Sequence, residues 1–220
     1  MSNLPFSIDA SPQGSQAWLE ARAGYITGSR AADVLATRRD GTPAAARQDY
    51  LVQLVAERLT GQPQEAGIVT PWMTRGSELE PEARLRLEQA IDQPIYECGF
   101  LRSVLHQVGC SIDGYVGASP AQGFVELKCP KPATHLRYLQ AGTVPADYVP
   151  QLLHNFLVTT ASQAWFASYC PQMPPKMQLL VCHVPRLTLH AQLREYADAV
   201  QGFEAEVRRE VETWRNYVAE

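Results

Sequence analysis

The chain has 220 residues, of which 45% are hydrophobic and 19% are charged, and this is the composition of a globular protein large enough to bury its own core. A formal net charge of −4 at pH 7 argues against a protein that binds polyanions through a generally basic surface, so any contacts with nucleic acid must be local. The five cysteines are odd in number and include no C-x-x-C pair, which argues against a zinc ribbon or a disulfide framework.

The chain carries no sign of insertion into a membrane. Its apolar runs are far shorter than the ~20 residues that cross a bilayer, and its first residues lack the basic start and apolar stretch of a secretory signal. We therefore expect neither membrane insertion nor secretion, and a cytoplasmic location. In a reducing compartment the cysteines are expected to be small buried apolar side chains rather than nucleophiles.

The first ninety residues are expected to be mainly helical. Ser15 is placed to cap a short helix, and apolar side chains recur on one helical face from residue 44 to 60 before Gly61 ends the pattern. A second helical pattern, rich in charged residues, runs from about 72 to 91. It contains Pro81, and a proline belongs in the first turn or kinks the turn before it. We therefore expect this helix to start or bend within the three residues that precede the proline.

Beyond residue 91 the chain changes to short segments rich in β-forming residues and bounded by Gly and Pro, followed by further helical patterns. The expected elements are strands at 95–101, 107–112, 124–129, 164–170 and 177–184 and helices at 148–161 and 187–217. No internal repeat or linker-like change of composition interrupts the chain, so we expect a single domain over residues 1–220. Helices, then a sheet, then helices predict a mixed α/β (α+β) fold.

One predicted hairpin brings together polar residues that could carry chemistry. Side chains alternate across a strand, so Glu126 and Lys128 share one face of the second strand while apolar side chains occupy the other. If the hairpin folds symmetrically about Ser119 and Pro120, Asp113 lies directly opposite Glu126, with their Cβ atoms about 5 Å apart. The alternative is a surface hairpin that carries a solvated Glu/Lys pair.

Two carboxylates this close repel each other, and the usual remedies are a raised pKa on one of them or a bound cation. Mg²⁺ commonly takes one or two carboxylates, keeps several waters and completes its shell with substrate phosphate. Asp113, Glu126 and the backbone carbonyl of Leu127 would be sufficient ligands. Lys128 could then hold or deprotonate an attacking water, a role open to a lysine whose pKa falls near cations.

Four stretches of the sequence resemble motifs of a known family. They are W-x3-R-x-G-x-I-T-x-S at residues 18–29, G-x3-E-x2-A at 76–83, an S-x-D-G and E-L-K-C-P pair at 111–114 and 126–130, and Y-x2-Q at 148–151. In this order they are similar to the PD-(D/E)xK nuclease superfamily, and within it to the phage lambda exonuclease or YqaJ-like viral recombinase group. One departure is Ile112, which stands where the superfamily usually has proline. Proline does no chemistry at this position, so its absence weakens the match to the family's motif more than it weakens the mechanism that the resemblance implies.

The resemblance implies a restriction-endonuclease-like core, in which a central mixed β-sheet is flanked by helices, and it implies roles for single residues. Glu80, Asp113 and Glu126 match the acids that face or hold the metal. Lys128 matches the catalytic lysine, and Gln151 matches a glutamine that lines the site. From the residues alone, Glu80 is equally one of several acids on a charged helix.

The resemblance also implies a pocket for a 5′-terminal phosphate, formed by Arg22 and Ser29. A guanidinium forks onto phosphate oxygens, and a serine at a helix start adds a hydroxyl beside backbone N–H donors. The alternatives are a solvated helix residue at Arg22 and a simple N-cap at Ser29. If the chain assembles as the family's ring of three, basic residues such as Arg75, Lys131 and Arg137 could be focused on one channel while the outside stays acidic.

The activity implied by the resemblance is a Mg²⁺-dependent 5′-to-3′ exonuclease, with Mn²⁺ left open as a substitute. It would act on the ends of linear double-stranded DNA, release 5′-mononucleotides and leave 3′ single-stranded tails for recombination with a single-strand annealing protein. The metal site alone does not distinguish cleavage modes, so an endonuclease or helicase-linked nuclease on the same core is a rival. A non-catalytic DNA-end-binding scaffold is the alternative from a different class.

The histidines have no acidic partner at an interpretable spacing. His106, His135 and His183 are expected to be structural or exposed to solvent. His154 lies one helical turn from Gln151 and is therefore retained as a weak candidate for the site.

Overall fold

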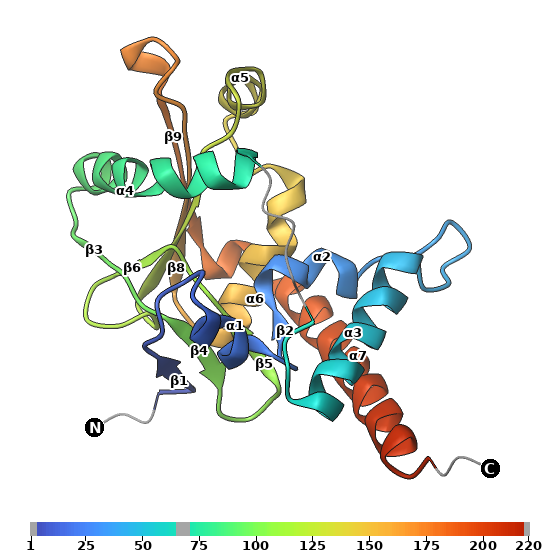
Figure 1. The fold of residues 1–220 in the computed structure, drawn as a ribbon. Coiled ribbons are helices and arrows are strands. Elements are labelled where there is room, and N and C mark those ends of the chain that lie inside the picture. Colours follow the sequence, from blue (N-terminus) through green and yellow to red (C-terminus); the bar gives the residue numbers. More distant parts are fainter. Residues whose placement is uncertain (1–3, 65–70, 218–220) are drawn as a thin grey trace.

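The computed structural model describes residues 4–64 and 71–217, apart from the side chains of residues 71–73. Its elements form a mixed α/β fold with two sheets flanked by helices, which confirms the expected fold class (Figure 1). The helices are α1 (Gln16–Arg22), α2 (Ala31–Val34), α3 (Ala45–Thr60), α4 (Pro71–Ile91), α5 (Pro132–Ala141), α6 (Val149–Thr159) and α7 (His190–Arg215), with short 3-10 turns η1 (Gly28–Arg30), η2 (Ala146–Tyr148), η3 (Pro175–Met177) and η4 (Arg186–Leu189). Within the described ranges, every helix is too short or too polar to span a bilayer.

The strands are divided between a four-stranded and a five-stranded sheet. The first has the order β1 (Phe6–Asp9), β4 (Phe100–Ser103), β5 (Val108–Cys110) and β2 (Ile26–Thr27), and only β2 and β5 pair in parallel. The second has the order β3 (Ile95–Tyr96), β6 (Gly114–Val116), β7 (Gly123–Lys128), β8 (Gln163–Tyr169) and β9 (Leu179–Pro185), and only β7 and β8 pair in parallel. Helix α4 packs against the second sheet, and α3 and α7 pack side by side away from it (Figure 1).

The hairpin of β6 and β7 has the predicted register. Gly114 is paired with Val125 and Val116 with Gly123, so the next position along the ladder sets Asp113 against Glu126. The Asp113 N–H also donates to the carbonyl of Val125 at 3.2 Å. The turn-rich segment between the strands therefore folds as the sequence indicates, and it brings the two acids to the same end of the sheet.

Alternation along β7 separates its two faces as predicted. Val125 and Leu127 belong to the smaller core, where Ala83 and Leu87 of α4 cover the second sheet. Phe124, on the opposite face, belongs to the larger core, which α6 and α7 share with the first sheet. Glu126 lies on this second face and is fully buried. The strand thus carries an acidic side chain into the interior, on the face that packs against the larger core.

Several local predictions are confirmed by the geometry at helix ends. The Ser15 Oγ accepts from the N–H of Trp18 at 3.2 Å and caps α1. Gly61 ends α3 with a left-handed φ of 67°, a conformation that costs glycine little. Helix α5 was not predicted, although Pro132 in its first turn and Gly142 after its end, with φ 63°, are the usual signals of a helix start and stop.

The helical pattern expected from about residue 72 to 91 is confirmed as α4, which begins at Pro71 and continues through Pro81. The alternative of a helix start just before the proline is therefore wrong. A single strand over 95–101 is also wrong, because its two ends belong to different sheets. Gly99 lies between them, where an added Cβ would collide with the carbonyl of Asp9, so the chain passes from one sheet to the other at a point of close backbone approach.

Candidate active site

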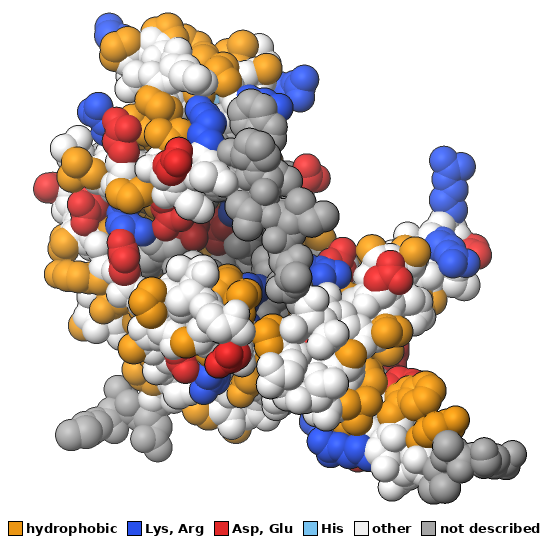
Figure 2. All heavy atoms as spheres, viewed as in Figure 1, with side chains coloured by type: hydrophobic (Ala, Val, Ile, Leu, Met, Phe, Trp, Pro, Cys, Tyr) orange, Lys and Arg blue, Asp and Glu red, His pale blue; other side chains and the backbone are white. Residues whose placement is uncertain are grey.

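A cleft of about 1120 Å³ opens between α4 and the N-terminal part of the chain. Its walls are formed by residues 8–14, by α1 and α4, and by the segment that enters β6. Arg22, Glu80 and Asp113 all line it, although they come from three separate parts of the sequence. Figure 2 shows this side of the molecule, with acidic side chains visible beside the hollow beneath α4.

Asp113 lies on the wall of this cleft, directly before β6. Its Oδ2 accepts a 2.6 Å hydrogen bond from the backbone N–H of Leu127, which ties the acid to β7. Burial raises the pKa of Asp113, while the charge of Lys128 acts in the opposite direction. Its position between the cleft and the sheet is the one expected of a metal ligand.

Glu126 lies behind Asp113 and is fully buried. Lys128 forms an ion pair with its Oε1, and the Asn155 side-chain amide donates to its Oε2 at 3.1 Å. Burial, and then the nearby charge of Asp113, raise the pKa of Glu126 to about 7 despite the opposing charge of Lys128. The mutual repulsion inferred from the hairpin register is therefore present, and it adds to the effect of burial in raising the pKa of Glu126.

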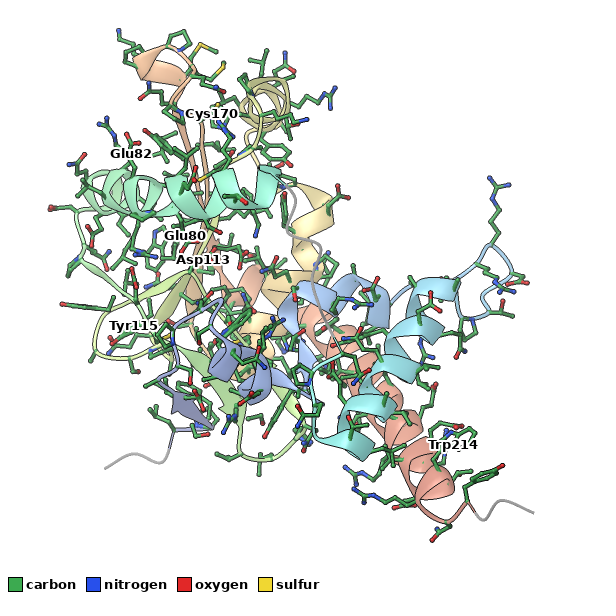
Figure 3. All side chains as sticks on the ribbon, in the orientation of Figure 1. Glu80, Glu82, Asp113, Tyr115, Cys170 and Trp214 are labelled. Atoms are coloured by element: carbon green, nitrogen blue, oxygen red, sulfur yellow. The ribbon has the colours of Figure 1, made fainter. Side chains whose placement is uncertain are left out.

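Glu80 reaches the cleft from α4 and faces the same centre. Arg84, one turn further along the helix, donates to Glu80 Oε1 at 2.9 Å and to the carbonyl of Asp113 at 3.2 Å, and it also pairs with Glu97. Burial and the charge of Asp113 raise the pKa of Glu80. Figure 3 shows Glu80 and Asp113 near each other, between α4 and the sheet, whereas Glu82 lies on the far side of α4.

Lys128 has its ammonium between the two acids and an aromatic ring. Burial alone would lower its pKa, but the charges of Glu126 and Asp113 outweigh burial and raise the pKa of Lys128 above its ordinary value. Its Nζ also lies 5.0 Å from the ring centroid of Tyr148, a cation–π distance. In this arrangement Lys128 is charged, so its action as a base requires that the acids' charge first be neutralised.

Helix α6 contributes one predicted residue and one that sequence reasoning missed. Gln151 lies in its first turn, and Asn155, four residues later, is on the same helical face. Asn155 is the residue that donates to Glu126. Its spacing from Gln151 was a signal that could have identified it, as the spacing of Arg84 from Glu80 could have identified that arginine.

His154 does not turn toward the acids. Its Nε2 lies 2.9 Å from the carbonyl of Gly109, so this nitrogen must carry the proton, and its Nδ1 accepts from the Tyr196 hydroxyl at 2.9 Å. Burial lowers the pKa of His154 to about 4. Both ring nitrogens are taken up by contacts that join α6 to β5 and α7, which supports the structural interpretation. His135 is likewise buried, between Ser168 and the carbonyl of Met177.

The donor atoms decide whether these side chains suit a divalent cation. In the part of the chain that the structure describes, no three His, Cys, Asp or Glu side chains already form a group able to hold a metal ion. Mg²⁺ nevertheless needs only one or two protein carboxylates when water and phosphate complete its shell. Asp113 and Glu126 offer buried, mutually repelling oxygens of the kind that a hard cation stabilises. The residues therefore fit a partly open cation site rather than a complete protein cage.

The cleft also contains Arg22, the arginine of the predicted phosphate pair. Arg22 Nη2 donates to Ser29 Oγ at 3.2 Å, and its guanidinium stacks 4.1 Å from the ring centroid of Trp18. Trp18 in turn donates from Nε1 to Ser111 Oγ at 2.9 Å, just before Asp113. The reading of Ser29 as an N-cap is wrong, because it lies inside η1, whose N-cap is Thr27. Arg22 is half-buried against Trp18, so it is not simply a solvated helix residue.

The three basic residues expected to line a DNA channel, Arg75, Lys131 and Arg137, have different surroundings. Arg75 donates to the carbonyls of Cys129 and Pro130 and so holds the segment that follows β7. Lys131 and Arg137 are exposed around α5. The cysteines are free thiols, and burial raises the pKa of Cys129, the one nearest the acids, to about 11. This thiol is therefore protonated at neutral pH, as expected of a residue that is not a nucleophile.

Comparison with known proteins gives a family and a fold. Residues 17–162 match the model of the YqaJ-like viral recombinase domain. The structure resembles that of an alkaline exonuclease, LHK-Exo, from Laribacter hongkongensis, with 32% identity, a TM-score of 0.79, and coverage of 91% of this chain and 96% of that one. LHK-Exo in complex with dAMP matches with the same identity and coverage and a TM-score of 0.77.

A more distant match shows the fold alone. The phage-related exonuclease from Haemophilus somnus 129PT is 13% identical, with a TM-score of 0.58 and coverage of 84% of this chain and 96% of that one. The search of curated proteins gave no match.

Proposed function

Because the chain belongs to the YqaJ-like viral recombinase domain family, we propose that it is a metal-dependent exonuclease that acts on the ends of linear double-stranded DNA. The observation that carries the proposal is the convergence of Glu80, Asp113, Glu126 and Lys128 beside a cleft that also contains Arg22. The similarity to an alkaline exonuclease over nearly the whole chain supports the same activity.

Four ligands are proposed for Mg²⁺, or for Mn²⁺ in its place: the carboxylates of Asp113, Glu126 and Glu80 and the backbone carbonyl of Leu127. When bound, the cation polarises the scissile phosphate and lowers the pKa of an attacking water. The chain itself keeps the acids in register through the β6–β7 ladder. Arg84 orients Glu80.

Lys128 and Gln151 are proposed to act on the attacking water. Lys128 would hold or deprotonate it, and it is anchored over Tyr148 so that its ammonium stays within reach of the acids. Gln151 is in the first turn of α6, on the face of Asn155, and would line the same site. Both roles depend first on the position of the side chain, since a base must lie within hydrogen-bond reach of the proton that it removes.

The direction of attack is proposed to follow from Arg22 and Ser29. A 5′-terminal phosphate held by their guanidinium and hydroxyl would fix the strand end relative to the acids, so that cutting proceeds 5′ to 3′ and releases 5′-mononucleotides. The complementary strand would remain as a 3′ tail for single-strand annealing. The complex of LHK-Exo with dAMP, a nucleoside monophosphate, supports a product of this class.

The wider setting is also proposed from the family. We place the activity in one nuclease domain over residues 1–220, in the cytoplasm, as a homotrimeric ring around DNA that works with a single-strand annealing protein. A ring would concentrate exposed cations such as Lys131 and Arg137 on a channel despite the net charge of −4. Sedimentation with and without a DNA duplex tests the subunit number.

A digestion assay tests the activity itself. Linear duplex labelled on one strand is incubated with the protein in Mg²⁺, in Mn²⁺ or in EDTA, together with a closed circular duplex. Metal-dependent release of mononucleotides from 5′ ends is the expected result. Cutting of the closed circle would instead support an endonuclease, and retention of DNA without loss of label would support a binding scaffold.

A further inference from the structure

The side-chain amide of Asn155 is buried in the interior, next to the carboxylate of Glu126. Asn155 is 0% exposed, and its Nδ2 donates to Glu126 Oε2 at 3.1 Å. An ionised carboxylate can only accept hydrogen bonds, so the amide nitrogen must face it and the amide oxygen must face away. Lys128 holds the other oxygen, Oε1. The orientation of the Glu126 carboxylate is therefore set from two sides, by a charge on its own strand and by a neutral donor from α6.

The amide oxygen of Asn155 faces Gly28 of η1, the residue directly before Ser29. A Cβ added to Gly28 would lie 2.7 Å from Asn155 Oδ1, closer than real Cβ atoms come to a neighbouring atom. Asn155 Oδ1 is itself buried without a hydrogen-bond partner. Burying a polar atom without a partner costs free energy, and an apolar side chain at this position would avoid that cost. The asparagine therefore indicates that the site requires the N–H donor of the amide.

We propose that Asn155 is a positioning residue that orients the Glu126 carboxylate toward the cation, and that Gly28 is the residue that keeps the Asn155 amide in place. The inference rests on the proposed metal-dependent function and deepens it. It links the turn that carries Ser29 to the acid buried in the sheet, because Asn155 Nδ2 donates to Glu126 while Asn155 Oδ1 occupies the space beside Gly28 that a Cβ would need. Removal of the amide leaves Glu126 Oε2 without its donor and free to rotate away from Asp113.

Two variants test this through metal binding in the absence of DNA. Asn155→Ala removes the donor, and Gly28→Ala displaces it while leaving its chemistry intact. Partners of a metal ligand typically change metal affinity by roughly 10- to 100-fold. We expect each variant to weaken Mn²⁺ binding, measured by titration calorimetry on the full chain, by about 10-fold. Gly28→Ala keeps the test decisive if Asn155→Ala fails to fold.

Thr159→Ala is the matched control. Thr159 is buried on the same helix and donates from Oγ1 to the backbone carbonyl of Asn155 at 2.6 Å, so its loss perturbs α6 without touching the amide. We expect this variant to lower the melting temperature while its Mn²⁺ affinity stays within about 2-fold of the wild type. Asn155→Ala should also lower kcat on linear duplex and leave KM near the wild-type value, because the phosphate pair is untouched.

A double-mutant cycle decides whether Asn155 acts through Glu126. In a Glu126→Gln background, Asn155→Ala should weaken Mn²⁺ binding by less than about 2-fold, since the carboxylate that it orients is gone. An equal loss in both backgrounds, or unchanged affinity in Asn155→Ala and Gly28→Ala, would overturn the inference and leave the proposed function intact. A wild-type protein that neither binds Mn²⁺ nor degrades DNA would overturn both.

Discussion

The acids at the second sheet and the arginine of α1 meet at one cleft, which Asp113 and Arg22 both line, and the fold holds their charges in different ways. Glu126 is fully buried, and its two oxygens are held by Lys128 and Asn155. Arg22 is half-buried, lies flat against an aromatic ring and donates to an exposed serine. The first region reaches from the cleft into the buried interior, whereas the second lies at the surface on one side.

The difference shows what each region is built to do. Acids whose pKa values are raised by burial are held in a state that a cation would stabilise, so their function depends on the orientation of their carboxylates. The half-buried guanidinium of Arg22 lies at the cleft, where a ligand arriving from solution can meet it, and its stacking on Trp18 limits the side-chain entropy lost on binding. Variants of the two regions should therefore fail in different ways.

The largest effect is expected in the buried region. Asp113→Ala, Glu126→Ala and Lys128→Ala should each lower nucleolysis by roughly 10³-fold or more, because each removes a charge placed at the reacting phosphate. Turnover on labelled linear duplex in Mg²⁺ measures this, and circular dichroism checks that each variant is folded. Near-normal turnover in any one of them would remove that residue from the proposed mechanism.

The next effect concerns the stability of the buried region at low pH. The pKa of His154 is lowered from its ordinary value to about 4 in the folded chain, so protonation favours the unfolded state. The contribution of neutral His154 to the free energy of unfolding is fully present above its ordinary pKa of about 6.5. This contribution, about 3 kcal/mol in all, is lost as the pH falls from there toward 4. Urea unfolding of the wild type across this range measures the loss.

His154→Gln provides the control for that measurement. Glu126, whose raised pKa acts with the opposite sign in the same range, is common to both proteins and cancels in the difference. The variant should therefore lose less stability than the wild type between pH 7 and pH 4. Parallel pH curves for the two proteins would show that His154 is not a buried neutral imidazole.

A smaller and more selective effect is expected in the open region. Arg22→Ala should lower the rate on 5′-phosphorylated ends by roughly 10- to 100-fold, the value of a charged hydrogen bond. Ends that carry a 5′-hydroxyl should be affected much less, since they offer no terminal phosphate to bind. Rates on the two kinds of end, measured side by side, test this. Equal losses on both would count against the phosphate pocket.

The smallest effect should come from the link between the two regions. Trp18→Phe keeps a ring beneath Arg22 but removes the hydrogen bond to Ser111. The loss of one such bond is worth about 1 kcal/mol, so the rate on phosphorylated ends should fall by no more than about 5-fold. If the variant behaves like Arg22→Ala instead, the tryptophan contributes more than support for the arginine.

Much of the hairpin could be predicted because its pattern is local. Alternation along residues 123–128, together with the turn-rich segment before them, specifies which side chains share a face and which residue stands opposite Asp113, and the observed register agrees. The cap at Ser15 and the stop at Gly61 were predictable for the same reason. The short motifs likewise identified the family whose model matches residues 17–162.

Long-range packing decided the rest. Neither sequence pattern nor motif revealed that residues 95–96 and 100–103 enter different sheets, or that Arg84 and Asn155 contact the acids from two helices. The state of Lys128 was also beyond the sequence, because its pKa depends on burial and on two carboxylates whose distances exist only in the folded chain. Periodicity and turn chemistry act between neighbours along the chain and are therefore written in the sequence, whereas the electrostatics of a buried site are sums over atoms that only the tertiary structure brings together.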